Sequence, residues 1–146
     1  MKNWGKVFVL IVCSIVIISS VILGGCMSQT RAARAEAKTF LTYAKYNQWD
    51  KAWEMLHPDC QSAWENQNTF INMMNSSSQN LIRFKLRKAI AIASWHHAGT
   101  DTSYSDVIEI PVSLIYSTTY GEKKRYQMIH TININGNWKF FQYPKE

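Results

Sequence analysis

The chain has 146 residues and a formal net charge of +6, from 16 basic and 10 acidic residues. This length predicts one domain with a real core and gives no sign of a second one. Three cysteines are present, and only one follows residue 26, which excludes an internal disulfide. The mildly basic balance favours anionic lipid headgroups, wall polymers or acidic protein surfaces over nucleic acid, unless it serves solubility alone.

The first 26 residues carry the clearest signal in the chain. Lys2 and Lys6 precede an apolar run from Val7 to Leu23, which Leu23-Gly24-Gly25-Cys26 closes. The run is shorter than the stretch of about 20 apolar residues that a transmembrane helix needs, and its small-residue end suits a cleavage site. We therefore predict a signal peptide over residues 1–25, with an uncleaved N-terminal anchor helix as the alternative.

The end of this run resembles the lipobox of exported bacterial lipoproteins, in which a branched aliphatic residue and two small ones precede a cysteine: Leu23, Gly24, Gly25 and Cys26. The resemblance implies that Cys26 becomes the first mature residue and carries a diacylglycerol on its sulfur. Lipid chains contribute about 0.8 kcal/mol per buried methylene, so the membrane is the first expected partner. The expected location is the extracytoplasmic side of the cell membrane. Removal of Lys2 and Lys6 lowers the net charge to +4.

Beyond a short tether over residues 26–30, the pattern predicts helices first. Asp50 is expected to cap a short second helix, which His57-Pro58 ends, and a third helix is expected from about Gln61 to Asn75. The third helix should bury Trp64, Ile71 and Met74 on one face. The first helix begins at Arg31, where apolar residues start to recur at spacings of three and four: Ala33, Ala37, Phe40, Leu41 and Ala44.

The second half alternates with period two and predicts an antiparallel sheet of about four strands. One strand is expected from Ile82 to Ile92 and a second from Ile108 to Thr119. Gly121 should turn the chain into a third strand, and the strong hairpin signal Asn135-Gly136 into a last strand from Trp138 to Tyr143. The helices should cover the apolar face, for which alternation selects Ile82, Phe84, Leu86, Ile90, Ile92, Ile108, Ile110, Val112, Leu114, Tyr116, Tyr126, Met128, His130, Ile132 and Ile134.

The helical half contains a run of aromatic and polar residues at a recognisable spacing: Tyr43, Asn47, Trp49, Asp50, Lys51, Ala52, Trp53, Leu56, His57 and Pro58, followed later by Phe70 and by Gly136-Asn137-Trp138-Lys139. Together with helices before a curved sheet, this run resembles nuclear transport factor 2-like domains over roughly residues 32–143. The resemblance implies one α+β domain over residues 31–146, a cone whose sheet wraps around the long N-terminal helix. That fold hosts enzymes, ligand binders and interaction modules alike.

Few side chains indicate catalysis or metal binding. Cone-fold isomerases and dehydratases pair a base with a hydrogen-bond donor in a dry pocket, and Tyr116 with His130 is the one such pair on the predicted inner face. Cys60 follows His57 closely, but no second cluster supports a nucleophile or a metal ligand there. Residues of the pair His96-His97 point to opposite faces of a strand, so we predict no metal and no cofactor.

Basic residues gather at two places, on one strand face at Arg83, Lys85 and Arg87 and at the turn Lys123-Lys124-Arg125. If the two groups lie near each other, they form a surface for an anionic partner. Otherwise they keep a sheet face solvated and prevent it from aggregating. Nucleic acid is not an expected partner of a secreted protein.

We therefore predict a non-catalytic binding or interaction module whose concave sheet contacts a small apolar ligand, an envelope protein or a second copy of the chain. Two other functions stay open: a subunit of an envelope secretion or conjugation-type assembly, and a small isomerase- or dehydratase-like enzyme. Eight residues are expected to line the pocket of an open cone. If their side chains fill the cone instead, these residues are simply part of the core. They are Phe40, Trp53, Phe84, Tyr116, Tyr126, Met128, His130 and Trp138.

Overall fold

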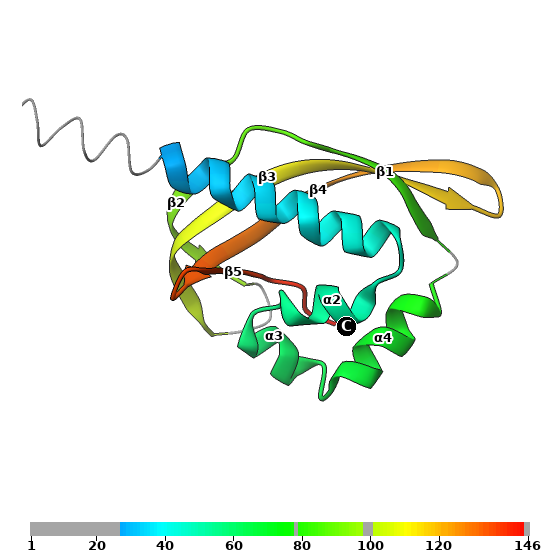
Figure 1. The fold of residues 1–146 in the computed structure, drawn as a ribbon, viewed down its shortest axis with the longest axis horizontal. Helices are drawn as coiled ribbons and strands as arrows, with labels where there is room; N and C mark the ends of the chain where they lie inside the picture. Colours follow the sequence, from blue (N-terminus) through cyan, green and yellow to red (C-terminus); the bar gives the residue numbers. More distant parts are fainter. Residues whose placement is uncertain (1–26, 78, 98–100, 145–146) are drawn as a thin grey trace, which may run out of the picture.

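The structure is a computed structural model that describes residues 27–77, 79–97 and 101–144 (Figure 1). Within these ranges the chain forms an α+β domain in which four helices pack against a five-stranded, open antiparallel sheet. The predicted signal peptide and the lipobox, including Cys26, lie outside the described residues. None of the described helices is both long enough and apolar enough to cross a membrane.

The first helix covers residues 27–45 and lies across one face of the sheet (Figure 1). Residues 27–30, which the sequence predicts as a tether, are helical and continue directly into it. Three short helices gather below the long one in Figure 1, and they are α2 (Trp49–Glu54), α3 (Pro58–Ala63) and α4 (Gln67–Asn75).

The caps of the short helices differ from the sequence prediction. Gln48 rather than Asp50 precedes α2, and Asp50 lies in its first turn. Pro58, which was expected only to end the second helix, is the first residue of α3. Proline is tolerated there because a backbone N–H in the first turn of a helix has no acceptor within the helix. His57 caps α3, since its Nδ1 accepts a hydrogen bond from the Asp59 backbone N–H at 3.2 Å.

The single third helix predicted from Gln61 to Asn75 is wrong, because α3 and α4 are separate. Glu65 lies between them in the left-handed region, with φ of 67°. The Asn66 side chain then starts α4 by accepting a hydrogen bond from the Thr69 N–H at 2.9 Å. An asparagine in this position satisfies a backbone donor that a new helix would otherwise leave unpaired. Trp64 therefore packs from the turn rather than from a helix face.

The five strands are β1 (Asn80–Leu86), β2 (Ile90–His96), β3 (Ser103–Thr118), β4 (Gly121–Ile134) and β5 (Asn137–Phe140). Their order is β1-β3-β4-β5, and β2 also pairs with β3. Strands β1 and β2 lie end to end along one edge of β3, where β1 pairs with residues 112–117 and β2 with residues 103–109. The last strand ends at Phe140 and not at Tyr143 as predicted.

The predicted single strand from Ile82 to Ile92 is divided by residues 87–89, which belong to neither β1 nor β2. The interruption changes which side chains face the core. Ala89, expected on the polar face, is buried, whereas the side chain of Ile90 is 51% exposed. This division raises the number of strands from the expected four to five.

The helices cover what we call the inner face of the sheet, which carries the buried residues Ile108, Ile110, Val112 and Leu114 of β3. Phe40 of the first helix stacks on Phe140 of β5 with ring centroids 4.8 Å apart. The backbone of β5 also binds the link between α2 and α3, since the Phe140 N–H donates to Met55 O and the His57 N–H donates to Phe140 O. The core is therefore closed by the last strand.

Both predicted turns are confirmed. Asn135 and Gly136 form a two-residue hairpin loop with φ of 52° and 87°, the left-handed conformation that a type I′ turn requires at both positions. Gly121 opens β4 with φ of 108°, and Thr118 pairs with it across the other two-residue loop. This loop fixes the register between β3 and β4.

The register corrects the predicted inner face of β4 by one residue. Directly paired residues share a face, so Ile129 lies beside Ile110 on the inner face, whereas Met128 lies beside Pro111 on the opposite, outer face. The larger apolar side chains at even positions suggested the reverse. Ile129 and Thr131 are the buried residues of β4. The side chains on the outer face are those of Tyr126, Met128, His130, Ile132 and Ile134.

Candidate functional site

The interior that the sequence predicts as a pocket is filled by its own aromatic side chains. Phe40 is 6% exposed, and its ring stacks on the ring of Phe140. Trp53 packs on the fully buried Phe70 with ring centroids 5.5 Å apart, and Trp64 packs on the same ring at 5.3 Å. Phe40, Phe70 and Trp64 belong to the buried core and Trp53 packs against it, so these residues are core in this structure.

The other predicted pocket residues are scattered over the molecule. Phe84 lines an open surface groove of about 480 Å³, and Trp138 lines a separate hollow of about 210 Å³. Tyr116 is half-buried against the core on the inner face. Tyr126 and Met128 lie on the outer face. The eight residues therefore do not enclose one ligand site.

Tyr116 and His130, the candidate acid-base pair, are not brought together. His130 pairs with Glu109 of β3, seven residues before Tyr116, which corresponds to about 23 Å along a strand. The two side chains also point to opposite faces of the sheet. Burial raises the pKa of Tyr116 against the opposing effect of Arg125. No single substrate atom can contact both side chains.

The outer face instead carries an exposed apolar patch. We call Ile90, Pro111, Tyr126 and Met128 the outer patch, since Pro111 pairs with Met128 and the other two side chains lie on the same face. Tyr126 is 64%, Met128 52% and Ile90 51% exposed. Three large apolar side chains on one face, each more than half exposed, are a feature of interaction surfaces.

Two cations flank Tyr126 of the outer patch. The Arg87 guanidinium lies 5.9 Å and the Lys124 ammonium 4.8 Å from the centre of the Tyr126 ring. A hydrogen bond from Lys124 is the main reason that the pKa of Tyr126 is lowered, and both cations act in the same direction. Arg83 lies across β3 from Lys124 and forms an ion pair of 2.6 Å with Glu122. Of the second basic group only Lys124 lies on this face, because Lys123 and Arg125 pair with the inner-face residues Tyr116 and Leu114.

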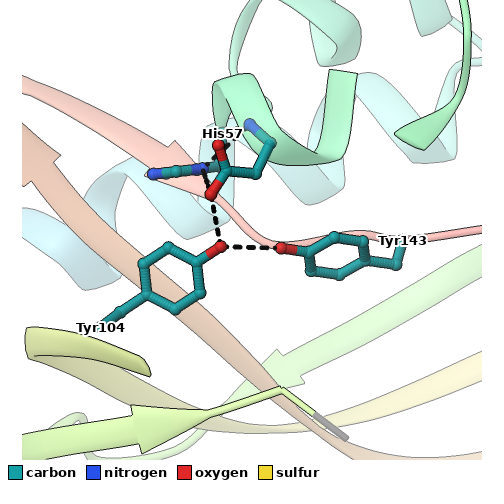
Figure 2. A network of polar contacts seen from close by, with 4 residues as sticks. His57, Tyr104 and Tyr143 are labelled. Carbon is teal, nitrogen blue, oxygen red and sulfur yellow. Dashed lines mark hydrogen bonds and ion pairs between the residues drawn. The ribbon is translucent and has the colours of Figure 1, made fainter. Parts of the chain in front are cut away.

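A polar network lies at the start of α3 (Figure 2). The Tyr104 hydroxyl donates to Asp59 Oδ2 at 2.5 Å and lies 2.9 Å from the Tyr143 hydroxyl. Burial and the bond to Asp59 raise the pKa of Tyr104. Burial also raises the pKa of the Cys60 thiol to about 12, so this cysteine is protonated at neutral pH and packs as a small apolar side chain.

Histidines and aromatic rings continue this network between the sheet and the C-terminal segment. His57 stacks on Phe141 at 4.6 Å, and His130 stacks on Trp95 at 4.3 Å. Burial lowers the pKa of His130, although the Glu109 carboxylate, 3.1 Å from Nε2, opposes the shift. No group of three or more metal-ligating side chains occurs among the described residues. These rings therefore join β2, β4 and α3 to the chain after β5.

Sequence reasoning missed several residues of these regions. Ile90 was assigned to the inner face because it continued the alternation of β1. No local pattern identifies Tyr104, since its partner Asp59 lies 45 residues away in the sequence. One local signal in the sequence could have indicated the position of Asp59. Asp59 lies two residues after His57, where a helix cap places its backbone N–H against the imidazole.

Comparison with known proteins adds no relative to this picture. No protein-family model matches the chain, and no curated protein matches it either.

Proposed function

We propose that the protein is a lipid-anchored, extracytoplasmic interaction module with a nuclear transport factor 2-like cone, and that it binds an envelope protein through the outer patch. The single observation that carries the proposal is the contrast between the two faces of the sheet. The inner face is filled by rings such as Phe40 and Phe140, whereas Ile90, Tyr126 and Met128 are exposed on the outer face. A filled interior favours a protein partner over a small ligand.

The charge around the outer patch specifies the chemistry of the partner. Arg87 and Lys124 flank Tyr126, so a surface with an apolar centre and an acidic rim would complement it. A symmetric dimer through this face would bring like charges of the two copies together, because an isologous interface uses the same patch twice. The cations therefore favour a different protein over a second copy, which is compatible with a subunit of an envelope assembly.

The experiment places a photo-crosslinking amino acid at Met128 of the full chain in the producing cell. Met73 of α4 is the matched control position, because it is 56% exposed and Met128 is 52% exposed. We expect one adduct from position 128 and none of the same mass from position 73. The adduct should disappear when Arg87→Glu and Lys124→Glu are combined, and persist when Lys45→Glu and Lys51→Glu are combined.

Two results would contradict this assignment. An adduct with twice the mass of the chain would identify a homodimer, and the absence of any adduct that depends on Arg87 and Lys124 would remove the outer patch as a docking surface. In both cases the partner class proposed above is wrong.

The lipid anchor is tested separately at Cys26. Cys26→Ala should abolish incorporation of a labelled fatty acid and leave the chain at its unprocessed mass, because the thiol is the proposed acylation site. Cys13→Ala is the matched control and should leave both unchanged. A Cys26→Ala protein that is still acylated and shortened shows that the anchor has been assigned to the wrong residue.

A further inference from the structure

A basic groove runs between the first helix and the edge strand β1, and its Lys85 pairs with Ser113, which pairs with Tyr126 of the outer patch. Its volume is about 480 Å³. Four of its residues are cations, with Arg31, Arg34 and Lys38 on the helix and Lys85 on β1. Spacings of three and four residues place the three helical cations on one side of the helix. The complete lining is Arg31, Arg34, Ala35, Lys38, Phe84, Lys85 and Leu86.

One cation of the groove is held in place by the sheet. The Arg34 Nε donates to Arg87 O and its Nη2 donates to Leu86 O, both at 3.1 Å. A guanidinium has five N–H donors, so these two bonds orient it and leave three donors for another acceptor. Planar, oriented donors of this kind suit phosphate oxygens.

The positive charge of the groove is not neutralised within the described chain. None of its described lining residues is acidic, and the ion pairs found among the described residues do not include its four cations. Glu36 of the same helix lines the other hollow, on a different side. Phe84 and Leu86 supply an apolar wall beside the cations. A ligand with both a phosphate and an apolar part would match this combination.

The groove lies at the beginning of the domain. A helix rises about 1.5 Å per residue, so Arg31 and Arg34 are about 6 and about 10 Å along the helix from residue 27. This residue directly follows the proposed lipidated Cys26. Since electrostatic attraction extends about 8 Å at physiological salt, Arg31 is within reach of headgroups around the anchor, and Arg34 lies about one helical turn further along.

We infer that this groove binds the phosphate groups of anionic phospholipids in the membrane that carries the protein, and that it thereby orients the domain on the bilayer. The inference rests on the proposed lipid anchor. A chain held only by its lipid would tumble about Cys26. Contacts of Arg31, Arg34 and Lys85 with headgroups would hold the first helix against the membrane.

The test uses the intact protein in vesicles of phosphatidylcholine alone, or of phosphatidylcholine with about one third phosphatidylglycerol. Acetylation of exposed lysines is followed by mass spectrometry. We expect acetylation of Lys38 and Lys85 to slow by about fivefold in the anionic vesicles, which is the effect of one surface contact, and to recover at high salt. Lys51 on α2 is the internal reference and should change little.

Matched variants separate groove binding from a general effect of charge. Arg31→Gln combined with Lys38→Gln should abolish the protection of Lys85. Lys123→Gln combined with Lys124→Gln removes the same charge from the β3–β4 hairpin, whose lysines do not line the groove, and should leave Lys85 protected. Arg34 is kept in both variants, because its bonds to the Leu86 and Arg87 carbonyls support the fold. Equal loss of protection in the two variants would overturn the inference.

Two further outcomes identify the source of the phosphate and separate this inference from the anchor. If millimolar glycerol phosphate protects Lys85 equally in neutral vesicles, the groove binds a free phosphate ester and the lipid assignment is wrong. Flotation with neutral vesicles tests the anchor alone. A protein that floats with both vesicle types but shows no difference at Lys38 and Lys85 retains the anchor and refutes the groove.

Discussion

The inner and outer faces of the sheet use alternate residues of the same strands, yet they are covered in different ways. Ile110 and Ile129 are paired neighbours on the inner face and lie under the helices. Pro111, which follows Ile110, and Met128, which precedes Ile129, form the next pair and lie on the outer face, where no described helix packs (Figure 1). Burial at one face supplies stability, while exposure at the other leaves apolar surface for a partner.

The largest expected effect is at the inner face. Phe140→Ala should lower the free energy of unfolding by about 3–5 kcal/mol, because it removes a buried ring that stacks on Phe40. The measurement is urea unfolding of the full chain in detergent. Tyr120→Ala is the control, since Tyr120 is fully exposed, and it should leave the midpoint unchanged. A small effect at position 140 would show that the inner face is not the core.

A smaller effect is expected where the chain turns between β4 and β5. Gly136→Ala should cost about 1–2 kcal/mol, because a side chain at φ of 87° is strained even where no neighbouring atom approaches. Asn135→Gly is the matched control and should change stability by less than about 0.5 kcal/mol. Equal effects of the two substitutions in urea unfolding would mean that the turn does not determine how β5 reaches the core.

Acidic pH should weaken the start of α3, where His57 stacks on Phe141 of the C-terminal segment. Burial lowers the pKa of His57, Lys139 acts in the same direction and Asp59 opposes them. The unfolded chain therefore binds a proton at His57 at a higher pH than the folded chain does. This contribution to stability is complete above about pH 6.5 and is lost as the pH falls through the lower, folded pKa.

The variant His57→Asn tests this dependence, because asparagine can also cap α3 but does not titrate. The unfolding midpoint should fall less steeply between neutral and mildly acidic pH than in the unmodified chain. His130, whose pKa burial also lowers, keeps part of the slope. An identical slope in both proteins would show that His57 does not contribute to it.

The smallest effect on stability is expected at the outer patch. Met128→Ala should change the free energy of unfolding by less than about 0.5 kcal/mol, since its side chain is 52% exposed. Ile129→Ala, the adjacent residue on the inner face, should cost about 2–5 kcal/mol. Urea unfolding of the two variants measures the difference between the faces directly. Similar costs would place both residues in one environment and remove the argument for a docking face.

Local signals predicted much of this fold. The spacing of Ala33, Ala37 and Phe40 identified the first helix, and Asn135-Gly136 identified the last hairpin. The predictions that were wrong concern features that depend on contacts between distant segments. Alternation could not give the phase of β4, because the two-residue loop before Gly121 fixes its register and the lone Ile129 carries little pattern.

Several residues of the candidate site were predicted from the sequence, but the face of the sheet on which they lie was not. Tyr126 and Met128 were selected for their size, and the register then put them on the outer face. The two basic groups were noted, and pairing through β3 brought Arg83 opposite Lys124. The groove was not foreseen, since it needs the first helix to lie beside Lys85 of β1.

The closure of the core by β5 has a consequence for how the chain is made. Lys139 donates to the Glu54 carbonyl, 85 positions earlier, and the Trp64 indole donates to the Gln142 carbonyl across 78 positions. These contacts form only after residues 139–142 have been synthesised, and long-range contacts of this kind form slowly. A chain still emerging from the ribosome therefore stays incompletely folded. A delay of this kind would suit the export that the proposed lipid anchor requires.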